Sequence, residues 1–266
     1  MEIFLYLGYL AAVGIGVILG LIGGGGSIIT VPVMVYLLGI NPIAATAYSL
    51  FLVGVASTVG AIRNAQLGYI DYHTGIMFSI PAFFTVYLTR AYLIPIIPKN
   101  VLIIQQFVLT KNTAVMLFFA LLMVMAAVSM IRSKGQKTKR GKKVRIQLPL
   151  ILLEGAGVGV VTGLVGAGGG FIIIPALVLV AGLEIKTAIG TSLFIIATKS
   201  LIGFLGDIQN SPIDWEFLLL FTSLAVAGIF IGLKYNNVMK GERLKKLFGW
   251  FILAMGLGII IKEIVL

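Results

Sequence analysis

The feature that most constrains this chain is an internal repeat built around glycine-rich segments. Residues 20–32 read GLIGGGGSIITVP, and residues 163–175 read GLVGAGGGFIIIP. The two segments lie 143 positions apart, and a gapless comparison of 20–60 with 163–203 gives 15 identities in 41 positions. Chance matches in an apolar chain do not place glycines, prolines and serines in one register. The chain therefore contains two copies of one unit, each with a glycine-rich break inside an apolar stretch.

Composition places both copies in a membrane. Hydrophobic residues make up 59% of the chain and charged residues only 11%, whereas a soluble domain has about a quarter charged residues. Apolar runs fill nearly the whole chain and leave no room for a soluble catalytic domain. The first run, 3–22, has no basic region ahead of it and no small-residue cleavage site, so we interpret it as a span rather than a signal peptide.

The same composition argues against metal and nucleic-acid chemistry. The chain has no cysteine and a single histidine, His73, so we expect no thiolate or histidine metal site and no cofactor. The net charge is +11, but eight of the twenty basic residues fall within Arg132–Arg145, between the two copies. That run favours a cytoplasmic linker that obeys the positive-inside rule. Contact with anionic lipid is the alternative, and nucleic acid is not expected as a partner.

Apolar segments divide each copy into five parts. They cover about 3–22, 27–40, 43–62, 74–97 and 101–131 in the first copy, and about 146–165, 171–183, 187–206, 213–233 and 244–266 in the second. Segment 101–131 is too long for one span, so we expect an interfacial stretch up to Lys111-Asn112. A full span needs about 20 residues. The short segments 27–40 and 171–183, which follow the breaks, are therefore half-helices or members of re-entrant hairpins.

We predict an all-α polytopic membrane protein with three parts: a first transmembrane repeat (1–131), a basic cytoplasmic linker (132–145) and a second transmembrane repeat (146–266). Five segments is an odd number, so the second repeat should be inverted relative to the first. With the linker inside the cell, both termini lie outside, and Arg90, Lys99 and Lys111 fall on the outer side. The inversion fails if 101–131 forms two crossings.

The breaks are the predicted substrate site. Irregular backbone at membrane depth must be buried in protein or line a wet cavity, and glycines let the backbone turn and approach a ligand. Each break opens a short helix, whose N-terminal N–H groups and dipole attract anions. Paired broken helices of this kind are a pointer to a transporter site, although glycines also permit tight helix packing. The break residues assigned to the site are Gly23, Gly24, Gly25, Gly26, Ser27, Gly166, Gly168, Gly169 and Gly170.

Polar side chains downstream of the breaks complete the predicted site. Tyr48, Ser49, Thr191 and Ser192 occupy equivalent places in ATAYSLF and AIGTSLF, where hydroxyls can donate to an oxyanion or simply bond to helix backbone. Lys199 is the basic residue well inside a span, and intramembrane charges are usually functional. The alternatives for Lys199 are a pair with Asp207 or Glu154, or snorkelling to the interface. Asp71 and Asp214 are expected to cap the helices that follow them.

These motifs resemble the sulfite exporter TauE/SafE family of membrane permeases. The resemblance rests on GxxLGLIGGGGSxxxVP at Gly16–Pro32, on the second copy of that motif and on TSLF at Thr191–Phe194. It implies a secondary transporter that moves sulfite, an organosulfonate or a related sulfur or carboxylate anion across the cytoplasmic membrane. A channel-like facilitator for small anions or neutral solutes is the alternative. No clustered acid–base set or nucleophile is present, so we do not expect an enzyme.

Overall fold

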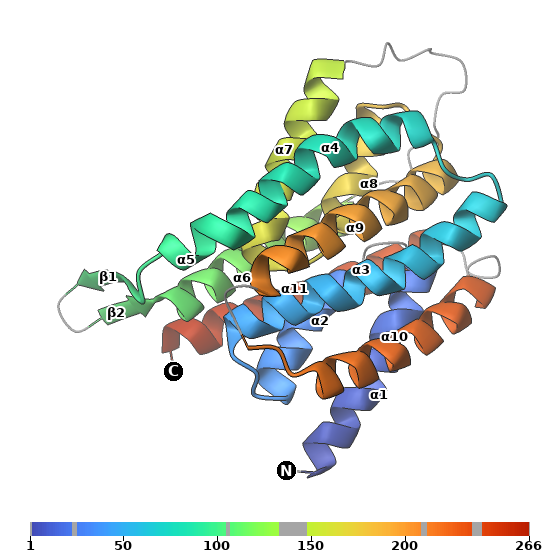
Figure 1. Ribbon diagram of the computed structural model, residues 1–266. Coiled ribbons are helices and arrows are strands. Elements are labelled where there is room, and N and C mark those ends of the chain that lie inside the picture. Colours follow the sequence, from blue (N-terminus) through green and yellow to red (C-terminus); the bar gives the residue numbers. More distant parts are fainter. Residues whose placement is uncertain are drawn as a thin grey trace.

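The computed structural model describes residues 2–22, 26–104, 107–132, 148–208, 212–235 and 241–265. These residues form a nearly all-helical protein with one small two-stranded hairpin (Figure 1). The predicted linker lies almost wholly outside the described residues, as do Gly23, Gly24 and Gly25 of the first break. The all-α membrane class expected from the sequence is confirmed.

The first repeat contains the following elements, in order: α1 (Glu2–Ile22), α2 (Ser27–Pro32), the π-helical turn η1 (Val33–Leu37), α3 (Pro42–Gln66), α4 (Tyr72–Leu88), the π-helical turn η2 (Thr89–Leu93), α5 (Ile94–Ile96), β1 (Asn100–Ile104), β2 (Phe107–Thr110) and α6 (Lys111–Arg132). The antiparallel strands β1 and β2 project from one side of the molecule. Helix α6 starts at Lys111, as expected. The stretch before it is a β-hairpin, which the sequence analysis did not anticipate.

The second repeat contains α7 (Leu148–Val165), α8 (Gly170–Leu179), α9 (Ile185–Ile208), α10 (Trp215–Tyr235) and α11 (Gly241–Val265). The first four match α1, the α2–η1 segment, α3 and α4 at an offset of about 143 residues, and α11 follows in the place of α6, which begins 130 residues earlier. The turn after the short helix is also repeated, because Gly39 and Gly182 both have φ of +68°. A positive φ of this size favours glycine, which explains why this pair is identical in the two copies.

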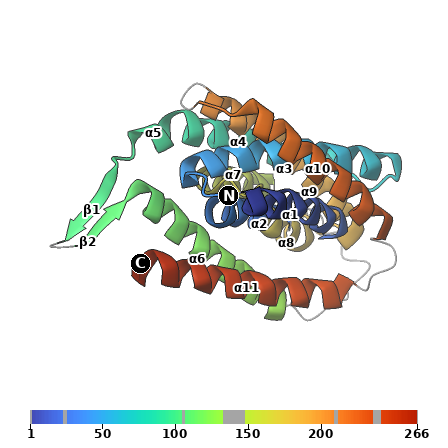
Figure 2. The same cartoon turned by 90° about the horizontal axis from the view of Figure 1, so that it is seen from below.

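Equivalent helices of the two repeats pack against each other in antiparallel pairs. Helices α3 and α9 form the central pair, in which Gly54 faces Leu201 and Gly60 faces Leu193. Helices α6 and α11 form the second pair along one flank (Figure 2), with Gly256 facing Met123. The residue numbers of contacting positions rise along one helix and fall along the other, so the two helices of each pair are antiparallel.

Two further helix pairs each combine one helix from the first repeat with one from the second. Helix α1 packs on α10, and its counterpart α7 packs on α4. Both pairs run parallel, since Gly16 and Gly20 approach Ala225 and Ile229 in order. In the other pair, Gly155, Gly159 and Gly163 approach Phe78, Ala82 and Thr89 in order. The absence of a side chain at these glycines lets the helix backbones approach closely, as in other membrane bundles.

The segment after the first break folds back along the helix before it. A Cβ atom built on Gly26 would lie 2.7 Å from the backbone nitrogen of Leu19, and one built on Gly8 would lie 2.4 Å from Leu38. Helix α1 and the α2–η1 segment are therefore antiparallel neighbours. At 1.5 Å per residue the 11 residues Ser27–Leu37 extend about 16 Å, about half the thickness of a bilayer core. This arrangement matches the re-entrant alternative.

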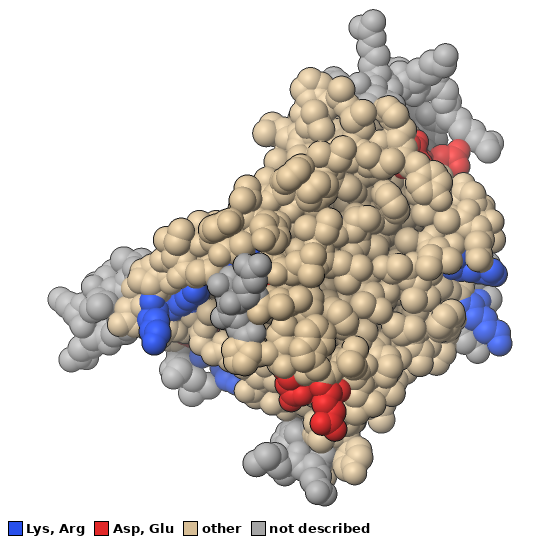
Figure 3. Space-filling model, in the orientation of Figure 1, with Lys and Arg blue, Asp and Glu red and all other residues tan. Residues whose placement is uncertain are grey.

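The surface suits a lipid environment. Six described helices are long and apolar enough to span a membrane: Pro42–Gln66, Tyr72–Ile96, Lys111–Arg132, Leu148–Val165, Ile185–Ile208 and Trp215–Lys234. Large apolar side chains point outward on both repeats, including Leu10 and Leu153, which are 73% and 70% exposed. In Figure 3 the charged side chains gather at the margins of the face shown and leave a broad uncharged middle. These features establish a multi-pass membrane protein.

Candidate functional site

The second break has a backbone that demands glycine. Gly166 and Gly169 have φ of +72° and +73°, a region that other L-residues rarely adopt. The surroundings leave no room for side chains, because a Cβ on Gly166 would lie 2.4 Å from the Thr46 backbone oxygen. A Cβ on Gly169 would lie 2.3 Å from Cγ2 of Thr162. The glycines of this break are thus required both by conformation and by close packing.

The start of α2 meets the second break at the middle of the α3–α9 pair. A Cβ on Gly168 would lie 2.5 Å from Cγ1 of Val53 and 3.2 Å from Cγ2 of Ile196 and from Cβ of Ser27. Val53 and Ile196 are repeat equivalents and lie halfway along α3 and α9. The first residue of α2 therefore lies against the second break, at the mid-depth of the two central helices.

Lys199 reaches this same place from α9. Its side chain is fully buried, and its Nζ donates a hydrogen bond to Thr162 Oγ1 at 2.7 Å. A Cβ on Gly169 would lie 3.4 Å from that Nζ, so the ammonium lies beside the start of α8. Snorkelling is wrong because the group has no exposed surface. A pair with Asp207 is also wrong because Asp207 pairs with Arg90.

We define the central junction as the residues where the start of α2, the second break, the central helices and Lys199 come together. Its members are Ser27, Val53, Thr162, Gly168, Gly169, Ile196 and Lys199. Four of these were assigned to the site from sequence: Ser27, Gly168, Gly169 and Lys199. Thr162 was missed, and the signal that marks it is a threonine one position before the GLVGAGGG motif.

Two predicted hydroxyls lie elsewhere and connect the repeats. The phenolic oxygen of Tyr48 accepts from the backbone N–H of Asp214 at 2.8 Å, and Thr191 Oγ1 accepts from the N–H of Asp71 at 2.9 Å. These are equivalent bonds, each holding the start of a helix in the other repeat. The predicted caps are confirmed, because Asp71 accepts from Thr74 N–H and Asp214 from Phe217 N–H.

The predicted serines differ from one another. Ser192 Oγ donates to the backbone oxygen of Ile189 at 2.8 Å, whereas Ser49 Oγ is buried without a hydrogen-bond partner. Ser57 and Ser200, which are repeat equivalents on α3 and α9, also have buried Oγ atoms without partners. Buried polar atoms are normally satisfied, so these three hydroxyls are exceptions among the residues that the structure describes.

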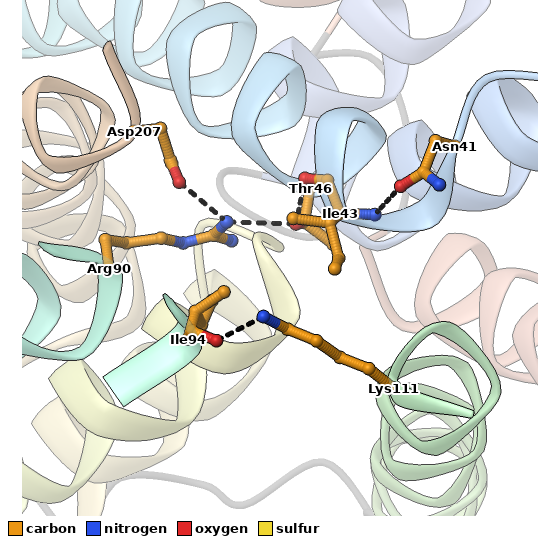
Figure 4. Close-up of polar contacts among 7 residues, drawn as sticks. All are labelled: Asn41, Ile43, Thr46, Arg90, Ile94, Lys111 and Asp207. Carbon is orange, nitrogen blue, oxygen red and sulfur yellow. Dashed lines mark hydrogen bonds and ion pairs between the residues drawn. The ribbon is translucent and has the colours of Figure 1, made fainter. Parts of the chain in front are cut away.

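A second buried cation was missed by the sequence analysis. Arg90 was assigned to the outer side of the membrane, and its side chain is fully buried in η2. Its Nη1 donates to Thr46 Oγ1 at 3.0 Å and lies 3.4 Å from Asp207 Oδ1 (Figure 4). Nearby, Lys111 Nζ donates to the Ile94 backbone oxygen. The sequence analysis used Arg90 only to assign the outer side of the membrane, and it did not predict the ion pair with Asp207, 117 positions away.

The acidic side chains of the described residues are few and dispersed. Within the described ranges no three histidine, aspartate or glutamate side chains gather closely enough to hold a metal ion. The buried carboxylate of Asp207 pairs with Arg90, whereas Lys199 has no acidic partner among the described residues.

Comparison with known proteins identifies the family. The model of the family described as sulfite exporter TauE/SafE matches residues 7–259. A probable membrane transporter protein of Xylella fastidiosa strain 9a5c is 26% identical over 253 residues, covering 92% of this chain and 91% of the relative. The probable membrane transporter protein YdhB of Bacillus subtilis is 25% identical over 235 residues, covering 87% and 90%. No solved structure matches the chain significantly. The chain therefore belongs to the sulfite exporter TauE/SafE family of membrane transporters.

Proposed function

We propose that this transporter is a permease for a small oxyanion, and that the anion binds at the central junction. The observation that carries the proposal is the fully buried ammonium of Lys199 beside the second break. Among the described residues, its hydrogen bond is to Thr162, a neutral partner. A buried charge without a counter-charge is costly, and a bound anion would remove most of that cost.

The backbone of the second break supports the same proposal. Helix α8 begins at Gly170, and its N-cap, Gly169, offers no side-chain cap. Unpaired N–H groups and the positive end of the helix dipole favour an anion at such a terminus. Lys199 Nζ lies next to this terminus, so the fixed charge and the backbone donors converge on one small volume.

The chemistry of the junction supports a substrate class. Glycines and hydroxyls at close quarters suit a compact oxyanion, such as sulfite, a small organosulfonate or a small carboxylate. The description of the family, sulfite exporter, supports a sulfur oxyanion. The printed names of the relatives say only that they are probable membrane transporters, so they support the transport activity and not the cargo.

We further propose that the two repeats have inverted topology around a two-fold axis in the membrane plane. The antiparallel α3–α9 and α6–α11 pairs support it, because equivalent helices of inverted repeats must run in opposite directions. The charge bias would then put the basic linker in the cytoplasm and both termini outside. A C-terminal tag accessible only from the cytoplasm would contradict this topology.

The binding proposal is tested by ligand-induced stabilisation of the purified protein. Sulfite, methanesulfonate and acetate are titrated, and the shift in melting temperature gives the affinity. Lys199→Ala should weaken binding by about 1–3 kcal/mol, in line with the loss of a charge-assisted hydrogen bond. Lys199→Arg should restore it poorly, because a planar guanidinium differs in shape from the ammonium.

The matched control is Lys186→Ala, the same change at an exposed lysine on the same helix. It should leave the affinity unchanged. If Lys199→Ala lowers the melting temperature without changing the affinity, Lys199 is structural and the proposed site is wrong.

A further inference from the structure

Arg90 has charged N–H donors that form no hydrogen bond with the described residues. Its Nη1 donates to Thr46 and Asp207, but its Nε and Nη2 atoms are buried and have no hydrogen-bond partner among the described residues. The Asp207 pair is long, at 3.4 Å, and Asp207 Oδ2 is also buried without a partner. Buried charged groups are usually hydrogen-bonded as fully as possible. The unsatisfied atoms therefore point to a further partner that binds here.

The unused atoms define the chemistry of that partner. The Nε–H and Nη2–H groups lie side by side on one edge of the planar guanidinium. This edge matches two oxygens of a carboxylate, sulfonate or sulfite, and such bidentate contacts are strong and directional. A cation is repelled by Arg90, and a neutral solute adds no negative charge to the long Asp207 contact. The partner is therefore an oxyanion.

The position of Arg90 connects it to the transport site without placing it in the junction. Thr46, which accepts from Arg90, packs against Gly166 at the beginning of the second break. Lys199 lies beside Gly169, at the other end of that break. Along α9, Asp207 is eight residues from Lys199, which corresponds to about 12 Å of helix. One break therefore has a buried cation near each end, at separate depths.

The Arg90–Asp207 ion pair has no counterpart at the positions that the repeat makes equivalent to it. The positions equivalent to Arg90 and Asp207 are Leu233 and Asn64, and Asn64 Nδ2 donates to the Gly60 backbone oxygen of its own helix at 2.8 Å. An ion pair needed only to hold the common fold would be expected in both repeats. The charge is instead confined to one end of the molecule, as suits a site that an anion occupies on its way to or from the junction.

We infer that Arg90 forms a second oxyanion site, in which its Nε–Nη2 edge binds one anionic group while Asp207 and Thr46 hold the guanidinium in place. This inference rests on the proposed function, since it assumes that the cargo is an oxyanion. Asp207 and the anion compete for the same guanidinium charge. The Asp207 contact is long, so the guanidinium charge can also attract an anion. Removal of the Asp207 carboxylate should strengthen that attraction.

The test is equilibrium dialysis of the purified protein with radiolabelled sulfite, repeated with labelled methanesulfonate. The unaltered protein should bind about two anions per chain. Arg90→Lys keeps the charge and removes the fork, so it should weaken one class of sites at least about tenfold, the loss expected for a bidentate contact. Arg63→Lys, the same change at an exposed arginine of α3, is the control and should bind as the unaltered protein does.

Asp207→Asn provides a second test if Arg90→Lys does not fold. It removes the carboxylate that competes with the anion, so the affinity of the second site should rise several-fold. The unliganded protein should melt at a lower temperature, because the ion pair is lost. Unchanged binding in Arg90→Lys or in Asp207→Asn would overturn the second site. If Lys199→Ala then still loses binding, the proposed function stands without it. If the unaltered protein binds neither anion, both proposals are contradicted.

Discussion

Replacement of Gly166 by alanine tests the close packing of the second break in the most quantitative way. The residue has φ of +72°, and the new Cβ would lie 2.4 Å from the Thr46 backbone oxygen and 2.5 Å from Thr46 Cα. The left-handed conformation costs an alanine about 1–2 kcal/mol. Overpacking against a rigid backbone adds about 1–3 kcal/mol. The free energy of unfolding should therefore fall by about 2–5 kcal/mol.

The control for this change is Gly39→Ala. Gly39 has φ of +68°, but a Cβ there would meet no atom within 4 Å, so the conformational cost of about 1–2 kcal/mol alone should remain. Unfolding is followed by tryptophan fluorescence in detergent, using Trp215 and Trp250. Gly166→Ala should also weaken anion binding, because it displaces Thr46 from Arg90. Equal losses of stability for the two variants would refute the claim that Thr46 packs directly on the break.

Three further predictions concern the contacts between helices and repeats. Thr162→Val removes the hydrogen-bond acceptor of Lys199 and should change anion affinity several-fold with little change in fold, as measured by dialysis and melting temperature. Tyr48→Phe removes the acceptor of the Asp214 N–H and should lower the free energy of unfolding by about 0.5–1.5 kcal/mol, with anion affinity unchanged. Gly159→Ala should destabilise by about 1–3 kcal/mol, because its Cβ would lie 2.4 Å from the Ala82 backbone oxygen. Gly157→Ala, two residues away with open space around it, should be neutral or stabilising. Similar melting temperatures for these two glycine variants would contradict the described packing of α4 on α7.

The sequence predicted the elements of this fold well where hydrophobicity and glycine position decide them. Segment 146–165 corresponds to α7 (Leu148–Val165), and segment 187–206 to α9 (Ile185–Ile208). The hairpin at Asn100–Thr110 was missed because a short apolar stretch at a membrane edge has the same composition as an interfacial helix. Hydropathy measures how well a segment suits lipid, and it does not distinguish a hairpin from a helix over ten residues.

The candidate site was harder to predict because its contacts join residues far apart in the chain. Lys199 stood out as a charge in an apolar span, but its partner Thr162 lies 37 positions earlier on another helix. Arg90 also interrupts an apolar segment, at 74–97, but it was used only to assign the outer side of the membrane, because nothing in the sequence connects it to Asp207. Tyr48 and Thr191 were correctly matched as equivalents, yet their hydroxyls bind backbone N–H groups of the opposite repeat.

The central claim is that a small oxyanion crosses the membrane by binding at Lys199. The most direct measurement is counterflow of radiolabelled sulfite in proteoliposomes, comparing the unaltered protein with Lys199→Ala and Lys186→Ala. The account predicts saturable counterflow in the unaltered protein and in Lys186→Ala, and a loss of at least about fivefold in Lys199→Ala, which corresponds to about 1 kcal/mol. Flux that does not saturate would favour the channel-like alternative. Equal counterflow in all three proteins would contradict the claim.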